Sequence, residues 1–250
     1  MKSFFCKAIV IALALLVNPA HSAEIRLKGA NSGAVYVEFI GEIQPSDAEA
    51  LKRLIEPYIS RANAFRVIYL NSQGGDVATA MKIGRYLRRL EFDTTVRDNA
   101  RCLSSCVFIL ASGLSKAVLD TNIIGIHRPF GTVTGSTSLE DATKKYREMT
   151  AQVYEYFDEM NLPRSLPEVM LRIPPEQMKM LSFDETERFG LVGKDPVAQE
   201  RDDASNAKRF GISRQEYLIR RSRALKACKS PPPNYIDTAC YEAILKRGHR

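Results

Sequence analysis

Histidine and long apolar segments are scarce in this sequence. Its 250 residues include three histidines, of which His21 and His249 lie close to the ends of the chain. Beyond the first 23 residues, no stretch is long and apolar enough for a membrane-spanning helix. Internal repeats and low-complexity tracts are also lacking. The sequence therefore predicts a globular protein in which any histidine chemistry depends on His127.

Motifs that bind metals or nucleotides are missing as well. No two cysteines have the Cys-x-x-Cys spacing of a zinc site, and no pair of histidines lies near them, so zinc is the less favoured use of these cysteines. The segment Gly190–Lys194 ends in Gly-Lys but lacks the spacing of a P-loop. No cofactor and no metal ion are expected, and any ATP-driven partner would be a separate protein.

Residues 1–23 have the features of a secretory signal peptide. Two early lysines precede the short apolar run Ala8–Val17, and small residues follow it. Cleavage is expected after Ser22, with cleavage after Ala23 as the alternative, and an uncleaved anchor is the competing interpretation. The prediction is export across the inner membrane to the periplasm.

The cysteines are expected to form disulfides in such a compartment. Removal of the signal leaves an even number, namely Cys102, Cys106, Cys228 and Cys240. Residues four apart on a helical turn lie about 6 Å apart, which is within reach of a disulfide. Local pairing is therefore predicted, Cys102 with Cys106 and Cys228 with Cys240.

The positive charge of the chain is confined to its last fifth. The formal net charge is +7, and residues 201–250 hold 12 Lys and Arg against 5 Asp and Glu, whereas residues 1–200 hold 24 of each. This basic segment could contact an anionic surface or an acidic partner, or it could be a solvated helix. Nucleic acid is not an expected partner.

Strand and helix patterns alternate along the middle of the chain. The expected strands are residues 34–43, 66–70, 94–97, 117–119 and 123–127. Helical patterns lie between the first strands, and the stretch 102–113 is predicted to be a helix buried on every side. This order predicts an α/β fold with a mainly parallel sheet. Residues 24–195 are expected to form one domain, and residues 196–250 a basic helical C-terminal appendage with a disulfide.

Three features follow predicted strands and point to a catalytic site. Ser104 and Ser105 precede an apolar helix, whose free N–H groups suit a nucleophile that generates an oxyanion, although either serine could simply be an N-cap. The pair Gly74-Gly75 would let a substrate approach the backbone, or it could be an ordinary turn. His127 is the candidate general base, or else a structural histidine.

These residues, in this order, resemble the Clp protease proteolytic subunit family of the ClpP/crotonase superfamily. Asn71–Gly75 resembles the family's N-S-P-G-G loop, with Gln73 in place of proline, and Ile124–Pro129 resembles its I-H-x-P strand. Leu181–Val192 resembles its L-S-x-x-E-A-x-x-Y-G-L-V ending. The resemblance covers about residues 34–193 and implies a spiral of β-β-α units with a mainly parallel sheet.

The resemblance also implies a mechanism. Ser104 is the expected nucleophile and His127 the expected base, while the backbone N–H groups of Gly75 and Ser105 are expected to hold the oxyanion. The substrate is expected to be a peptide or a protein. Self-association into a homo-oligomer is expected from the family.

One family residue has no counterpart in register. The aspartate that precedes the L-S serine by four positions falls on Met178, so Glu176 is the tentative third catalytic member and Asp184 the alternative. The main hypothesis is an exported serine peptidase. Its alternatives are an esterase that uses the same site and a catalytically silent binding protein, and a coenzyme A enzyme is less favoured.

Overall fold

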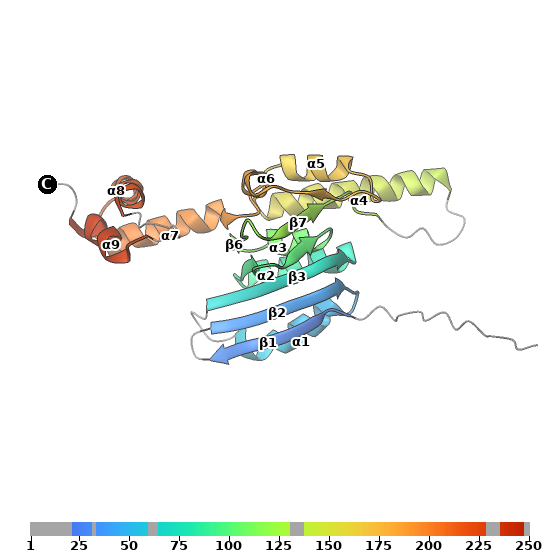
Figure 1. Ribbon diagram of the computed structural model, residues 1–250, viewed down its shortest axis with the longest axis horizontal. Coiled ribbons are helices and arrows are strands. Elements are labelled where there is room, and N and C mark those ends of the chain that lie inside the picture. The colour runs from blue at the N-terminus through green and yellow to red at the C-terminus, as the bar shows by residue number, and fades with distance from the viewer. Residues whose placement is uncertain (1–21, 32–33, 60–64, 131–137, 229–235, 248–250) are drawn as a thin grey trace, which may run out of the picture.

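Figure 1 shows the computed structural model of the chain. The structure describes residues 22–31, 34–59, 65–130, 138–228 and 236–247. The predicted signal peptide therefore lies almost wholly outside the described residues. Among the helices of the described part, none combines the length and the apolar character needed to cross a membrane.

A nine-stranded sheet forms the centre of the molecule. Its strands are β1 (Glu24–Asn31), β2 (Ala34–Ile43), β3 (Phe65–Gly75), β4 (Asp93–Val96), β5 (Arg101–Leu103), β6 (Ser115–Ala117), β7 (Ile123–Ile126), β8 (Lys179–Met180) and β9 (Gly193–Lys194). β2, β3, β4 and β6 pair in parallel, as do β3, β5 and β7, whereas β1, β8 and β9 join antiparallel. The expected α/β fold with a mainly parallel sheet is confirmed.

β3 is shared by two branches of this sheet. Residues Val67–Leu70 pair with β4, and Ser72, further along the same strand, pairs with Cys102 of β5. The sequence pattern predicts a strand that ends at Leu70, but β3 continues to Gly75 because Glu42 and Ile43 of β2 remain paired with its last residues. The extended end of β3 therefore lies beside β5.

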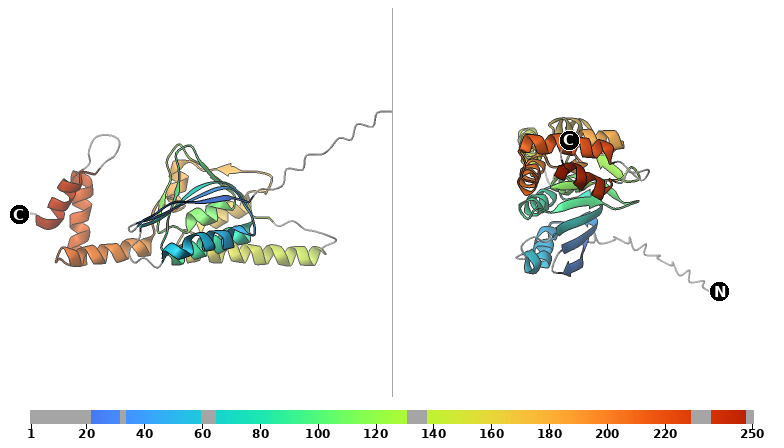
Figure 2. Two further views of the ribbon diagram at one scale, coloured as in Figure 1. Left: turned by 90° about the horizontal axis from the view of Figure 1, so that it is seen from below. Right: turned by 90° about the vertical axis from the view of Figure 1, so that its left-hand side faces the viewer.

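Of the helices in the described residues, some pack against the sheet, and the three C-terminal ones extend away from it (Figure 2). The helices are α1 (Asp47–Ile59), α2 (Val77–Arg89), α3 (Cys106–Ala111), α4 (Leu139–Glu159), α5 (Ser165–Arg172), α6 (Phe183–Arg188), α7 (Pro196–Arg209), α8 (Arg214–Ala227) and α9 (Thr238–Arg247). All six residues of α3 are buried. Phe108 of α3 stacks on Phe157 of α4 with ring centroids 4.9 Å apart, and the Tyr156 hydroxyl donates to the Phe108 carbonyl at 2.6 Å.

The helix predicted over residues 102–113 is shorter than expected. Cys102 lies in β5, Ser104 and Ser105 form a turn, and the helix begins at Cys106. An apolar run without periodicity does not distinguish a buried strand from a buried helix, and here a strand and a helix share it. The two serines therefore lie between the end of β5 and the start of α3.

The C-terminal helices have a small core of their own. Ala207, Tyr217 and Leu245 are buried together there, and the predicted Cys228–Cys240 disulfide joins the end of α8 to α9 with Cα atoms 5.6 Å apart. In Figure 2, α7 leads away from the sheet toward α8 and α9. The division of the chain into domains at residue 195 stays a prediction.

Asp195 connects the sheet region to α7. It is 1% exposed, and its carboxylate accepts hydrogen bonds from Arg88 at 2.5 Å, from Asn161 at 3.0 Å, and from two N–H groups in the first turn of α7. Burial alone would raise the pKa of Asp195, but the hydrogen bonds from Arg88, Asn161 and Ala198 together lower it below the usual value. The ionised form of Asp195 therefore stabilises the folded state.

Replacing this carboxylate should destabilise the fold. We expect Asp195→Ala to lower the free energy of unfolding by about 3 kcal/mol, because it leaves Arg88 without its buried partner and removes the cap of α7. Asp202→Ala is the control, since Asp202 pairs with Lys194 on the surface and should contribute less than about 1 kcal/mol. Denaturant titration measures both, and equal losses would contradict the role given to Asp195.

The same carboxylate should make stability depend on pH. The pKa of Asp195 is lowered on folding, so its contribution is complete above the unfolded value near 3.8 and is lost as the pH falls from there through the folded pKa. We expect the acid-induced loss of stability to be shallower in Asp195→Ala than in the wild-type chain. Denaturant titrations between pH 5 and pH 2 (about the range over which carboxylates titrate) measure this difference.

Candidate active site

Three neighbouring parallel strands bring the candidate residues to one edge of the sheet. Cys102 of β5 pairs with Ser72 of β3 on one side and with Ile124 of β7 on the other. The carboxyl ends of β3, β5 and β7 therefore meet, as is usual for sites in open α/β sheets. The turn after β5 carries Ser104, and His127 directly follows β7.

Ser104 lies in a strained turn between a strand and a helix. Its φ of 53° is in the left-handed region, which costs a residue with a side chain about 1–3 kcal/mol and is common at functional sites. Its N–H donates to the Gly125 carbonyl at 2.8 Å, two residues before His127. The residue is half-buried, and within the described ranges its hydroxyl has no hydrogen-bond partner. The Ser104 hydroxyl is therefore not used to hold the turn and is available to react.

The neighbouring Ser105 has a structural use for its hydroxyl. It is 1% exposed, and its Oγ donates to the Gly75 carbonyl at 3.0 Å, which ties the turn to the end of β3. Although Ser105 occupies the N-cap position of α3, its side chain makes no capping hydrogen bond. The Ser105 backbone N–H finds no acceptor among the residues that the structure describes. It is therefore a free donor beside the Ser104 side chain.

Gly74 and Gly75 allow β3 to approach this turn closely. Both have positive φ, 98° and 144°. A Cβ on Gly74 would lie 2.7 Å from the Ser104 Cβ and 3.1 Å from the Ser105 nitrogen, so only glycine fits there. The Asp76 N–H donates to the Ile43 carbonyl at 2.8 Å, and Ile43 is the residue of β2 that pairs with Gly75. Alternate residues of a strand in a parallel ladder direct their N–H groups at the same neighbour, so the N–H of Gly75, which precedes Asp76, points away from β2.

His127 is held by a backbone carbonyl. It is 7% exposed, and its Nδ1 lies 3.0 Å from the carbonyl oxygen of Arg128. Because a carbonyl only accepts, Nδ1 carries the proton in the neutral ring, and Nε2 presents a lone pair. The ring also packs against Phe130, with centroids 5.8 Å apart. This tautomer is the one that a general base of a serine nucleophile requires.

Within the described residues, no carboxylate forms a hydrogen bond or an ion pair with His127. Glu176 and Asp184 are both exposed, and neither forms a hydrogen bond or an ion pair with His127 in the described part of the chain. Continuing the antiparallel register of β7 and β8 places Met178 opposite His127, and the Met178 sulfur packs against Gly125. An apolar side chain thus occupies the position where the family pattern has its acid.

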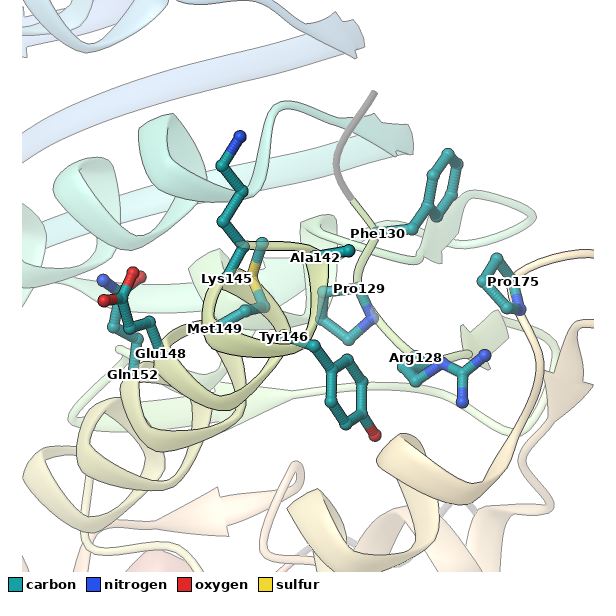
Figure 3. Close-up of a pocket in the computed structure, with 10 residues that line it drawn as sticks. All are labelled: Arg128, Pro129, Phe130, Ala142, Lys145, Tyr146, Glu148, Met149, Gln152 and Pro175. Carbon is teal, nitrogen blue, oxygen red and sulfur yellow. The ribbon is translucent and has the colours of Figure 1, made fainter. Parts of the chain in front are cut away.

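A pocket that the sequence did not reveal lies beyond His127. It has a volume of about 640 Å³ and is formed by Arg128–Phe130, by α4 and by Pro175. Figure 3 shows Tyr146 and Met149 of α4 facing this segment, with the Arg128 guanidinium beside the Tyr146 ring. The wall is mainly apolar, which suits an apolar side chain of a ligand. In the sequence, the only feature that indicates this pocket is the pair Pro129-Phe130, which follows Arg128.

The disulfide between Cys102 and Cys106 spans the serine turn. It joins the middle of β5 to the first residue of α3, with Cα atoms 5.2 Å apart. Both predicted disulfides are therefore present. Among the described residues, no cluster of His, Cys, Asp or Glu could hold a metal ion.

A comparison with protein-family models agrees with this geometry. The model of the Clp protease family matches residues 58–200, which is more than half of the chain and includes β3, the serine turn and His127. The chain belongs to the Clp protease family. A search of curated proteins finds no significant match. This Clp protease family member thus has a ClpP-like serine peptidase fold, and the roles of its individual site residues remain predictions.

The close approach of Gly74 to Ser104 can be tested with alanine. Gly74 and Gly193 have similar φ values, 98° and 94°, but only Gly74 has neighbours that a Cβ would meet. We expect Gly193→Ala to cost about 1 kcal/mol of unfolding free energy and Gly74→Ala at least about 2 kcal/mol more, because of the added clash. Denaturant titration measures the difference, and similar losses would argue against tight packing at the serine turn.

Proposed function

We propose that this protein is an exported serine peptidase that works with a Ser104–His127 dyad. The observation that carries the proposal is that neighbouring strands end in a strained Ser104 with an unbonded hydroxyl, after β5, and in a His127 ring whose Nδ1–H is fixed by the Arg128 carbonyl, after β7. The carbonyl supplies the orientation and the tautomer that an aspartate supplies in a triad. It does not supply a negative charge, so a slower enzyme than a full triad is expected.

The proposed reaction is acyl transfer through an acyl-enzyme. The Ser104 Oγ attacks the carbonyl carbon of a peptide bond while its proton passes to Nε2 of His127. The imidazolium then gives this proton to the leaving amine, and water hydrolyses the ester by the reverse sequence. The N–H groups of Gly75 and Ser105 would stabilise the oxyanion, by about 3 kcal/mol for each donor. The unbonded Ser105 N–H and the outward-facing Gly75 N–H support this role.

The pocket beside His127 supports a peptide as the substrate. In the proposed complex, an extended chain with its scissile carbonyl at Ser104 would place a neighbouring apolar side chain against Pro129, Phe130 and Met149, which line this pocket. An esterase would need the same Ser104 and His127 but much less of this pocket. Peptide and ester substrates with the same acyl group distinguish the two activities. Self-association, a partner for the basic tail and a third catalytic role for Glu176 or Asp184 stay predictions.

A fluorophosphonate probe tests the nucleophile. We expect the probe to label the wild-type chain at Ser104 and to leave Ser104→Ala unlabelled, because the probe reacts only with an activated hydroxyl. Ser105→Ala is the matched control, and it should keep most of the labelling while it loses about 1 kcal/mol of stability with its hydrogen bond to Gly75. Mass spectrometry of the labelled peptide identifies the residue.

Two results would overturn this assignment. Labelling that persists in Ser104→Ala and disappears in folded Ser105→Ala would exchange the roles of the two serines. A folded wild-type chain that the probe does not label would favour a catalytically silent protein that binds peptides in the pocket, and the Met178 side chain in place of an acid is the observation that favours this alternative.

The proposed export is supported by the position of Ala23. Its backbone nitrogen lies 3.3 Å from the Oδ2 of Asp47, a carboxylate that is 1% exposed. Cleavage after Ser22 would turn this nitrogen into an ammonium group beside a buried carboxylate, which stabilises a new N-terminus. We expect N-terminal sequencing of the periplasmic fraction of expressing cells to begin at Ala23. Full-length protein retained in the cytoplasm would contradict export.

A further inference from the structure

The Cys102–Cys106 disulfide closes a short loop around Ser104. Cys102 is held from both sides, because β5 pairs with β3 and with β7 at this residue. Cys106 is the first residue of α3, and both cysteines are completely buried. The two ends of the disulfide are therefore anchored in the sheet and in the buried helix, and Ser104 lies between them.

The loop has a conformation that needs support. Ser104 has a φ of 53°, a value that a serine seldom adopts unless its surroundings impose it. Two backbone hydrogen bonds hold the residue, from its N–H to Gly125 at 2.8 Å and from the Val107 N–H to its carbonyl at 3.1 Å. Without a covalent tie between Cys102 and Cys106, rotation at Ser104 toward ordinary φ values would relieve this strain.

We propose that the Cys102–Cys106 disulfide is a positioning element for the nucleophile, because it fixes the strained Ser104 turn between β5 and α3. This inference rests on the proposed function. The disulfide touches neither substrate nor reacting atoms, and it acts through the direction of the Ser104 side chain and of the Ser105 N–H. Its loss would therefore lower the rate of acyl transfer without weakening substrate binding in the pocket formed by Arg128–Phe130 and α4.

The second disulfide gives the chain a matched control. Cys228–Cys240 has the same chemistry but joins α8 to α9 in the C-terminal helices, around a loop with a sequence separation of 12 rather than 4. The longer loop restricts the unfolded chain more, so its removal should cost at least as much stability. If both disulfides are purely structural, the loss of activity on removing each one should follow the loss of stability that its removal causes. The positioning role predicts a loss of activity for the first disulfide alone.

The experiment compares two double variants of the full chain, C102A/C106A and the control C228A/C240A. A fluorophosphonate probe gives the labelling rate, and a chromogenic peptide gives kcat and KM. We expect C102A/C106A to lose at least about tenfold in labelling rate and in kcat with KM changed less than about twofold, since small displacements of a nucleophile are costly. The control should keep wild-type values. Folded C102A/C106A that is labelled at the wild-type rate would overturn the inference.

Hydrogen exchange separates this inference from the proposed function. In C102A/C106A, the peptide that covers residues 103–106 should exchange faster than in the wild-type chain, while β3 and α2 keep their protection. If the probe does not label the wild-type chain, the proposed function fails. Unchanged exchange over residues 103–106 in C102A/C106A, in contrast, overturns the positioning role of the disulfide whatever the probe shows. C102S/C106S is the second variant, and if neither variant folds, the disulfide is a folding element and the positioning role is overturned.

Discussion

The site depends on the pairing of one short strand with two neighbours. β5 has only three residues, and its central residue, Cys102, pairs with Ser72 of β3 and with Ile124 of β7. β5 can pair there because β3 extends beyond the residues that pair with β4, and β5 pairs with this extension. A shift of β5 by one residue would reverse the side to which each residue points and would move the serine turn away from β7.

The chemistry at this edge relies on backbone groups more than on side chains. The Arg128 carbonyl orients His127, the Gly125 carbonyl anchors the Ser104 N–H, and the Gly75 carbonyl takes up the Ser105 hydroxyl. Each contact uses an atom that every residue type possesses. In the proposed mechanism, a carboxylate is not needed to orient the imidazole, because a main-chain carbonyl that no mutation removes already does so.

The sequence was informative where periodicity or motif order was strong. The alternation over residues 34–43 predicted β2 with its observed bounds, and the order of the glycine pair, the serines and His127 predicted which strand ends meet. The division of the stretch 102–113 into strand, turn and helix was missed, because a continuous apolar run has no period. β1 was missed as well, since its residues directly follow the predicted signal and carry charges at alternate positions.

Other features of the site could not come from sequence patterns. The support of His127 by the Arg128 carbonyl involves a main-chain atom and depends on the bend after β7. The pocket combines Arg128–Phe130 with residues of α4, and nothing in either segment indicates the other. The family resemblance favoured Ser104 over Ser105 as the nucleophile, but the structural use of the Ser105 hydroxyl, which donates to the Gly75 carbonyl, had no signal in the sequence.

The charges of β1 have a consequence for the behaviour of the protein in solution. Among the described strands β1 pairs with β2 alone, so it is an outer strand of the sheet, the kind of strand with which a neighbouring molecule can pair. Glu24, Arg26 and Lys28 are exposed at every second position along this edge. Pairing with another chain would desolvate these charges, so the edge resists the fibrous aggregation to which uncharged edge strands are prone.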